Sequence, residues 1–284
     1  MSFWSTARGV VRLGAGVVLA AGAYMAFEAQ WLATRERDLP VPQLPPDLEG
    51  LRILHLSDVH AGQPGLNLWT LRKAAEWGAA QEPHLLVLTG DVLGAGRGAG
   101  RCLALLAQVR PSLGTFAVTG NHEYGLSKNP FAHRPQQFAW QEAGVRVLQD
   151  ECVLVATGPR GTGSRIVLCG ADYLTGGHSL RGPTPEAGAV ALLLTHLPPA
   201  PDEPPRAGFA ATFAGHTHGG QIRMPTPWGK RRVHGGEFAH VEGVHRWGEG
   251  SLAVSTGIGT TFLPLRLATR PEAVLYRLRG SASA

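Results

Sequence analysis

Five mostly apolar segments of this chain each end at a turn that carries a residue able to bind a metal ion. The segments comprise residues 52–56, 85–88, 116–118, 190–194 and 210–213. Continuous apolar runs of this length are typical of strands buried in a parallel sheet or between two sheets. Because the carboxyl ends of parallel strands meet at one edge of a sheet, the polar residues that follow them are expected to converge. The pattern predicts an α/β fold with one polar site at that edge.

The turns supply seven candidate metal ligands of the carboxylate, amide and imidazole types. They are Asp58, His60, Asp91, Asn121, His196, His216 and His218. Two of these turns place their ligands at alternate positions of an extended segment, so each pair of side chains leaves the same face. No cysteine occurs in the turns, whereas a structural zinc site is normally closed by four ligands that often include thiolates. The donor set predicts two divalent ions per chain, of Mn, Fe or Zn, with positions open for water and substrate.

The ordered motifs Asp-x-His, Gly-Asp, Gly-Asn-His-Glu, His and Gly-His-Thr-His resemble those of the calcineurin-like metallophosphoesterases. The resemblance extends over roughly residues 51–279. Residues 215–225 (Gly-His-Thr-His-Gly-Gly-Gln-Ile-Arg-Met-Pro), 257–261 and 263–266 are similar to the branch of the family with an N-terminal membrane segment or export signal. The resemblance implies a four-layer α/β/β/α sandwich of the metallophosphoesterase type, preceded by an N-terminal hydrophobic helix. Alternating strands and helices followed by strand-rich sequence agree with two sheets stacked between helices.

The resemblance also implies how the candidate ligands divide between two ions. The first ion would be held by Asp58, His60 and His218, and the second by Asn121, His196 and His216, with Asp91 bridging both. In the implied reaction, hydroxide bound between the two metals attacks phosphorus directly. No phosphoenzyme is therefore expected.

His122 is the implied catalytic residue and would bind no metal. In the family this histidine contacts the phosphate or protonates the leaving oxygen. Many members carry a second aspartate after the Gly-Asp motif, but this chain reads Gly-Asp-Val-Leu-Gly over residues 90–94. The carboxylate that would orient His122 is thus absent, and Glu123 or a backbone carbonyl is the expected substitute.

One catalytic domain is expected in this chain of 284 residues, because the motifs must fold together. The expected divisions are a membrane anchor or signal segment at 1–33, a proline-rich tether at 34–50, the metallophosphoesterase domain at 51–280 and a tail at 281–284. Spaced apolar residues predict helices at 68–80, 101–108 and 135–143.

The amino-terminal segment contains fifteen residues without a charge, 13–27. This is shorter than the ~20 apolar residues that span a bilayer, although extension to Trp31 would supply the length. Three interpretations are open: an uncleaved membrane anchor, a cleaved export signal of a secreted protein, or a buried helix of the domain. Arginines are nearly balanced on the two sides of the segment, so no orientation is predicted.

The three cysteines predict no disulfide framework, because their number is odd. Cys102 and Cys169 lie in apolar patterns and are expected to be buried and unpaired, and Cys152 has no evident partner.

The net charge of +5 suits anionic substrates or an anionic membrane surface. Nucleic acid is not an expected partner, because basic residues are not interleaved with stacking aromatics. We expect a metal-dependent phosphoesterase that acts on a phosphorylated small molecule or a lipid-linked substrate near a membrane. Apolar residues in predicted loops, including Phe262 and Leu263, favour the lipid-linked substrate.

Three other functions are compatible with the sequence. They are a UDP-2,3-diacylglucosamine pyrophosphatase-like activity, a general phosphodiesterase with a soluble substrate, and a non-catalytic scaffold that retains the fold. A missing ligand would favour the scaffold, and all seven candidates are present.

Overall fold

The computed structural model describes most of the chain. The described residues are 3–94, 98–127, 139–158, 161, 163–178, 180–182, 188–227, 229–232 and 238–281, without the side chains of 3–11, 230 and 232.

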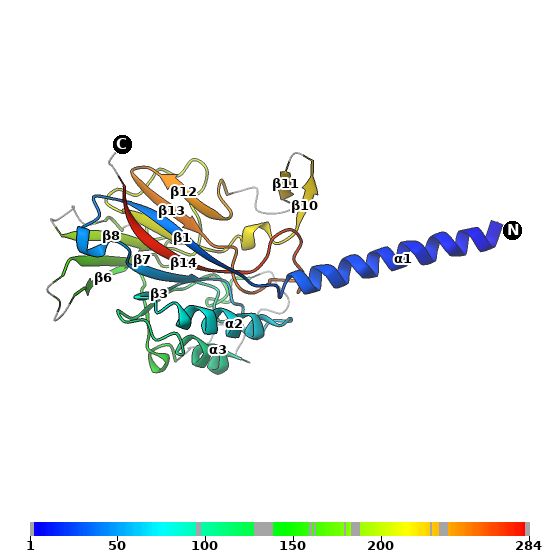
Figure 1. Ribbon diagram of the computed structural model, residues 1–284, viewed down its shortest axis with the longest axis horizontal. Helices are drawn as coiled ribbons and strands as arrows, with labels where there is room; N and C mark the ends of the chain where they lie inside the picture. The colour runs from blue at the N-terminus through cyan, green and yellow to red at the C-terminus, as the bar shows by residue number, and fades with distance from the viewer. Residues whose placement is uncertain are drawn as a thin grey trace.

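Two six-stranded sheets form the body of the protein (Figure 1). The first has the order β1-β14-β2-β3-β4-β5, with β1 at Ala33–Pro42, β14 at Glu272–Ser281, β2 at Arg52–Leu56, β3 at Leu85–Thr89, β4 at Thr115–Val118 and β5 at Val145–Val147. The second has the order β12-β13-β9-β8-β7-β6, with β12 at Gly243–Trp247, β13 at Gly250–Val254, β9 at Ala211–Ala214, β8 at Ala189–Leu194, β7 at Arg165–Gly170 and β6 at Glu151–Ala156. A separate hairpin joins β10 (Arg223–Thr226) to β11 (Gly229–Arg232).

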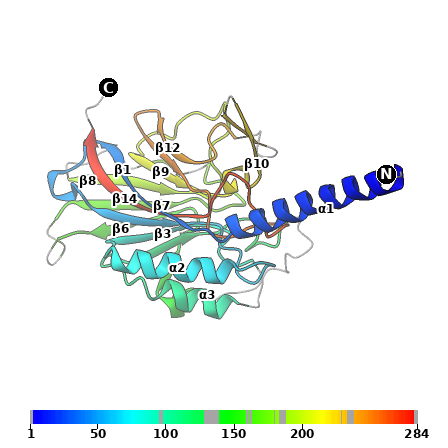
Figure 2. The same cartoon turned by 45° about the vertical axis from the view of Figure 1, so that its right-hand side comes forward.

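The largest part of the core lies between the two sheets. Ile53 of the first sheet and Leu192 and Phe213 of the second belong to the same buried cluster. Leu54, the neighbour of Ile53, instead joins a second cluster with helices α2 (Asn67–Ala80) and α3 (Ala99–Leu106), because successive side chains of a strand point to opposite faces. Burial on both faces explains why the strands of the first sheet are apolar without alternation. Figure 2 shows both helices on the outer face of this sheet.

The second helical layer of the expected α/β/β/α sandwich is not found in the described part of the chain. Loops cover the outer face of the second sheet, where Leu180 and Phe209 pack on Leu193. The loop at residues 198–205 contains five prolines, which lack the N–H that a helix needs. The mixed α/β fold with two sheets is therefore confirmed, with one helical layer on the first sheet.

The predicted helices are confirmed in two of three places. α2 and α3 correspond to the helices expected at 68–80 and 101–108. The third expectation is wrong over its described residues, where only a 3₁₀ turn, Gln141–Ala143, is present. Residues 135–138 of that segment lie outside the described residues, as do 282–284 of the predicted tail.

Residues 34–42, expected to form part of a proline-rich tether, instead belong to β1. This strand pairs in parallel with β14 along its whole length, and Leu39 and Val41 are fully buried. Pro40 and Pro42 are compatible with the strand because β1 lies at the edge of the sheet, where one side of the strand makes no ladder hydrogen bonds. The segment is a structural part of the domain.

An N-terminal helix, α1 (Phe3–Glu28), precedes β1 and projects away from the sheets (Figure 1). Its last turn is docked on the domain: buried Glu28 accepts a hydrogen bond from the backbone N–H of Thr269 (2.8 Å), and the N–H of Arg266 donates to the Met25 carbonyl (3.0 Å). Over the described ranges, no helix combines the length and hydrophobicity needed to cross a membrane. A membrane-spanning anchor is therefore not supported.

The cysteine expectation is wrong for two of the three residues. Cys152 and Cys169 form a disulfide, whereas Cys102 is free and buried. Their strands, β6 and β7, are antiparallel neighbours in a register that places the two cysteines directly opposite each other. This pairing depends on strand register, which an odd number of cysteines does not reveal.

Candidate metal centre

The candidate ligands follow the carboxyl ends of five strands, as the sequence predicts. In the first sheet, β2, β3 and β4 are parallel neighbours. In the second sheet, β8 and β9 are parallel neighbours. The turns after these strands carry, in chain order, the Asp-x-His, Gly-Asp, Gly-Asn-His, His and Gly-His-Thr-His motifs. The two sheets therefore bring all five turns to one region of the molecule.

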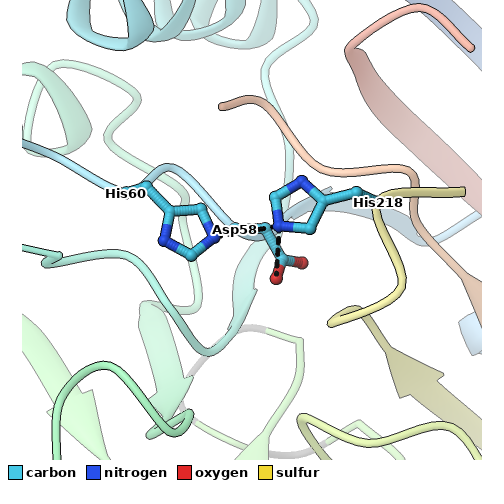
Figure 3. A group of neighbouring side chains, drawn as sticks. All are labelled: Asp58, His60 and His218. Carbon is cyan, nitrogen blue, oxygen red and sulfur yellow. Dashed lines mark hydrogen bonds and ion pairs between the residues drawn. The ribbon is translucent and has the colours of Figure 1, made fainter. Parts of the chain in front are cut away.

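The first ligand group consists of Asp58, His60 and His218 (Figure 3). Nε2 of His60 lies 2.9 Å from Nε2 of His218, and Nε2 of His218 lies 3.6 Å from Oδ1 of Asp58. Oδ2 of Asp58 accepts hydrogen bonds from the hydroxyl of Ser57 (2.5 Å) and the backbone N–H of His216 (2.9 Å). Among the described polar atoms, Oδ1 of Asp58 is buried without a hydrogen-bond partner. This free oxygen fits a cation held by the group.

The second ligand group consists of Asp91, His196 and His216, joined by Asn121. Nδ1 of His216 lies 3.0 Å from Nε2 of His196. Oδ1 of Asn121 lies 3.3 Å from the same nitrogen. Two imidazole nitrogens, a carboxylate and an amide oxygen thus converge, a donor set suited to Mn, Fe or Zn.

Asp91 links the two groups through one oxygen. Its Oδ2 lies 3.4 Å from Nε2 of His196, 3.8 Å from Nε2 of His60 and 3.9 Å from Nε2 of His122. Its Oδ1 accepts a hydrogen bond from the backbone N–H of His122 (2.8 Å), which orients the carboxylate. Among the described carboxylates, Asp91 is the one that lies within 4 Å of imidazole nitrogens of both groups.

The backbone is strained at most of the ligand positions. Five of the seven candidates have φ values between 48° and 67°: Asp58, His60, Asp91, His216 and His218. This left-handed region is uncommon for residues other than glycine. Such strain collects at functional sites, where the surrounding structure maintains it.

Burial and charge set the protonation of the cluster. Burial lowers the pKa of His60 and of His216 to about 3, so both imidazoles are neutral, as metal ligands must be. Burial also opposes protonation of His196, but the charge and hydrogen bond of Asp91 outweigh it and raise the His196 pKa to about 10. Despite its own burial, Asp91 has a pKa well below the ordinary value because of His196. A metal ion would take the place of the proton on His196.

Glu123 is one of the two expected supports of His122, and this expectation is wrong. Glu123 accepts hydrogen bonds from the backbone N–H groups of Asp91, Leu93 and Gly120 (2.8–3.0 Å), so it joins the turns after β3 and β4. Nδ1 of His122 instead lies 2.8 Å from Nε2 of Gln63, which also lies 3.2 Å from Nδ1 of His60. No motif indicated Gln63, because its contact with His122 depends on the folding of two separate turns.

Arg266 is a second residue near the site, in the segment 263–266, to which the sequence assigned no role in the site. It is fully buried and donates hydrogen bonds to the carbonyls of Thr256 (2.8 Å) and Gly259 (2.5 Å). Its Nη2 lies 3.4 Å from Nδ1 of His218. The backbone N–H of Gly259 in turn donates to the Asp58 carbonyl (2.8 Å). Arg266 therefore ties the C-terminal loop to the first ligand group.

Gly215 leaves the space in which Asp58 lies. A Cβ atom at this position would overlap Oγ of Ser57 and Oδ2 of Asp58. Gly215→Ala is therefore expected to displace Asp58 and to weaken metal binding by the first group ~10–100-fold, the usual effect of disturbing a ligand's support. Calorimetric titration of the metal-free protein with Mn²⁺ or Zn²⁺ measures this change.

Gly100→Ala is the matched control for that substitution. Gly100 lies in α3, and a Cβ atom there would meet nothing within 4 Å. Metal affinity of this variant is expected to equal that of the unaltered protein. Unchanged metal binding in Gly215→Ala would contradict the assignment of Asp58 as a ligand.

Comparison with known proteins finds relatives over the part of the chain that carries these motifs. The family model described as calcineurin-like phosphoesterase matches residues 51–220. Phosphodiesterase YaeI of Escherichia coli is 30% identical over 240 residues, which are 80% of this chain and 82% of YaeI. The uncharacterized metallophosphoesterase YkoQ of Bacillus subtilis is 28% identical over 243 residues, 82% of this chain and 85% of YkoQ. A Bos taurus protein named transmembrane protein with metallophosphoesterase domain is 33% identical over 213 residues, 68% of this chain and 46% of that protein.

Proposed function

This chain belongs to the calcineurin-like phosphoesterase family, and from this membership we propose that it is a dinuclear metal-dependent phosphodiesterase. The observation that carries the proposal is the convergence of two buried ligand groups on Asp91. A scaffold without activity has no need of this arrangement, in which five ligand positions have strained backbones. The relative YaeI, named a phosphodiesterase, supports a diester as the substrate.

Asp58, His60 and His218 would hold one ion, and Asn121, His196 and His216 the other, with Asp91 between them. When bound, two such ions neutralise charge on the phosphate oxygens and lower the pKa of water. The residues of the chain fix the donor atoms in place: Ser57 and the His216 backbone hold Asp58, and the Thr89 carbonyl lies 2.7 Å from Nδ1 of His196. In metal sites a ligand is typically oriented by a hydrogen bond to its other ring nitrogen or carboxylate oxygen, the one that does not face the metal.

His122 would protonate the oxygen of the leaving group. Its ring is held at Nδ1 by Gln63, so Nε2 is left for proton transfer. That nitrogen lies 3.9 Å from Oδ2 of Asp91, at the centre of the site. The ring packs edge-on against His60 at a centroid distance of 4.5 Å, which places it beside the first ligand group. His122 thus lies within reach of a phosphate that would be bound by the two ions beside Asp91.

The test uses the purified full-length chain, chelated and then loaded with Mn²⁺, Fe²⁺ or Zn²⁺. Bis(p-nitrophenyl) phosphate, p-nitrophenyl phosphate and a nucleoside diphosphate sugar distinguish diester, monoester and pyrophosphate hydrolysis. We expect diester hydrolysis that is lost on chelation, is restored by metal, and coincides with about two ions per chain. Full activity after exhaustive chelation would refute the proposal.

We further propose that the substrate is lipid-linked and is met at a membrane surface. Phe262 and Leu263 are exposed on a loop whose carbonyls at Thr261 and Leu263 accept hydrogen bonds from Gln221, three residues after His218. The same region joins α1, since Arg266 donates to the Met25 carbonyl. The described side chains of α1 include exposed Leu13, Val17, Val18, Leu19 and Phe27. Apolar side chains near the metal centre favour an acyl-bearing substrate, of which a UDP-2,3-diacylglucosamine-type pyrophosphate is one form.

Deletion of residues 2–20 tests this part of the proposal. The cut leaves Met25 and Glu28, through which α1 docks on the domain. Hydrolysis of a soluble diester is expected to be unchanged, because no candidate ligand or proton donor lies in α1. Hydrolysis of a diester embedded in vesicles is expected to fall ~10²-fold, since the enzyme is no longer concentrated at the surface. Equal activity on both substrates would contradict a membrane role of α1.

A further inference from the structure

A cavity of about 190 Å³ adjoins the second ligand group. His196 and the preceding Thr195 form part of its wall. Three aromatic side chains, Tyr173, Phe238 and Trp247, also line it. Tyr173 lies in the loop after β7, Phe238 lies before β12, and Trp247 is the last residue of β12. The cavity is therefore formed by the second sheet and its loops.

The cavity is continuous with the second ligand group. The ring of Tyr173 packs edge-on against His196 at a centroid distance of 5.9 Å. The ring of Phe238 packs edge-on against His216 at 5.6 Å. A substrate group in the cavity would therefore contact the rings next to two proposed ligands of the second ion. His122, in contrast, packs against His60 of the first group.

The charged residues of the cavity wall are already engaged with the protein. Arg206 donates hydrogen bonds to the carbonyls of Gly176 (2.6 Å) and Gly177 (3.1 Å) and lies 3.4 Å from Glu203. Asp172 accepts hydrogen bonds from the hydroxyl of Tyr124 and the N–H of Leu174. These contacts pin the loops that form the wall. Thr195, Thr212, His178 and His196 also line the cavity, and the other lining side chains are aromatic or aliphatic. Among the described lining residues, Arg206 is the one arginine or lysine and is already engaged, so the cavity does not suit a second phosphate group.

We propose that this cavity binds a planar ring, either an aryl group or a nucleobase, on the ester oxygen that stays attached to phosphorus. The inference rests on the proposed diesterase function. In that function His122, whose ring lies beside the first ligand group, protonates the oxygen of the leaving group. The ester group that remains then faces the second group and the cavity. Aromatic side chains bind flat rings through offset or edge-to-face contacts. Tyr173 and Trp247 are the residues that determine this specificity.

Three diesters that share a p-nitrophenolate leaving group test the proposal. Their retained groups are methyl, phenyl and thymidine 5′-yl. Since the leaving group is constant, differences in kcat/KM report the retained group. We expect the phenyl or thymidine ester to exceed the methyl ester by ~10-fold, mainly through a lower KM, because stacking on aromatic side chains contributes ~1–3 kcal/mol per base. A gain with phenyl alone identifies an aryl substrate, and a gain with thymidine alone identifies a nucleotide.

Tyr173→Ala and Trp247→Ala are expected to lower the ratio of kcat/KM for the phenyl ester to kcat/KM for the methyl ester to about one. Trp247 also packs on the core residues Leu252 and Val254, so Tyr173 provides the independent variant if Trp247→Ala does not fold. Trp69→Ala is the matched control, since Trp69 is exposed on α2. Equal kcat/KM for the three esters in an active enzyme overturns the proposal. The proposal is also overturned if both variants lower kcat/KM for the methyl ester as much as for the phenyl or thymidine ester. The cavity would then bind the leaving group, which the three esters share.

A binding measurement separates this proposal from the diesterase function. Phenylphosphonate and methylphosphonate are titrated into the metal-loaded full-length protein by calorimetry, and no turnover is needed. Tighter binding of phenylphosphonate that disappears in Tyr173→Ala supports the ring site, even if no diester is hydrolysed. Hydrolysis of diesters with equal binding of the two phosphonates supports the diesterase function and overturns the ring site.

Discussion

Replacing Asp91 with asparagine is expected to lower turnover by about 10³-fold, because the bridging negative charge is lost between two dications. Oδ2 of Asp91 lies within 3.4–3.9 Å of Nε2 of His60, His122 and His196. A unit charge pair about 4 Å apart contributes about 4 kcal/mol at an effective dielectric constant of about 20. An amide supplies the same shape without that charge.

The fold of the Asp91→Asn variant should be unchanged. Its side-chain oxygen can still accept the hydrogen bond that Oδ1 receives from the His122 backbone (2.8 Å). Circular dichroism checks the fold, and metal analysis should show fewer than two ions per chain. Asp202→Asn is the control, because Asp202 is exposed in a loop. Retention of both ions and of full turnover in Asp91→Asn would show that this carboxylate does not bridge.

The strands and the positions of the candidate ligands after them were predictable because their signals are local. Each apolar run and its turn lie within a few residues, and β2, β3, β4, β8 and β9 end at the motifs. Parallel pairing brings the turns together within each sheet, and the packing of the two sheets then joins the two sets of turns. The approach of Asp91 to His60 and His196 agrees with the bridging position that the family resemblance implies.

The remaining features depend on register and on distant contacts. β1 pairs with β14 more than two hundred residues away, and its prolines resemble those of an extended linker. The Cys152–Cys169 disulfide likewise requires the register of β6 and β7. Gln63 and Arg266 contact His122 and His218 only after separate segments have folded together. A single sequence contains no local pattern for such contacts.

Replacing His122 with alanine is expected to lower turnover ~10²–10⁴-fold, the usual contribution of a positioned proton donor. His122 lies within ligand distance of His60 and Asp91, but the four other histidines of the site complete the two proposed ligand groups without it. Metal content should therefore remain at two ions per chain. Loss of metal in this variant would instead make His122 a ligand.

The leaving group distinguishes proton transfer from simple positioning by His122. Nitrophenolate departs without protonation, whereas an alkoxide requires a proton as its bond to phosphorus breaks. The His122→Ala variant should therefore lose more activity on an alkyl diester than on a p-nitrophenyl diester. Gln63→Ala removes the contacts of Gln63 with Nδ1 of His122 (2.8 Å) and with Nδ1 of His60 (3.2 Å), so metal content is measured beside turnover. With metal content unchanged, it should give a smaller loss than His122→Ala with the same dependence on the leaving group. Equal losses on both substrates would assign His122 to phosphate binding, because a residue that only holds the phosphate affects every leaving group alike.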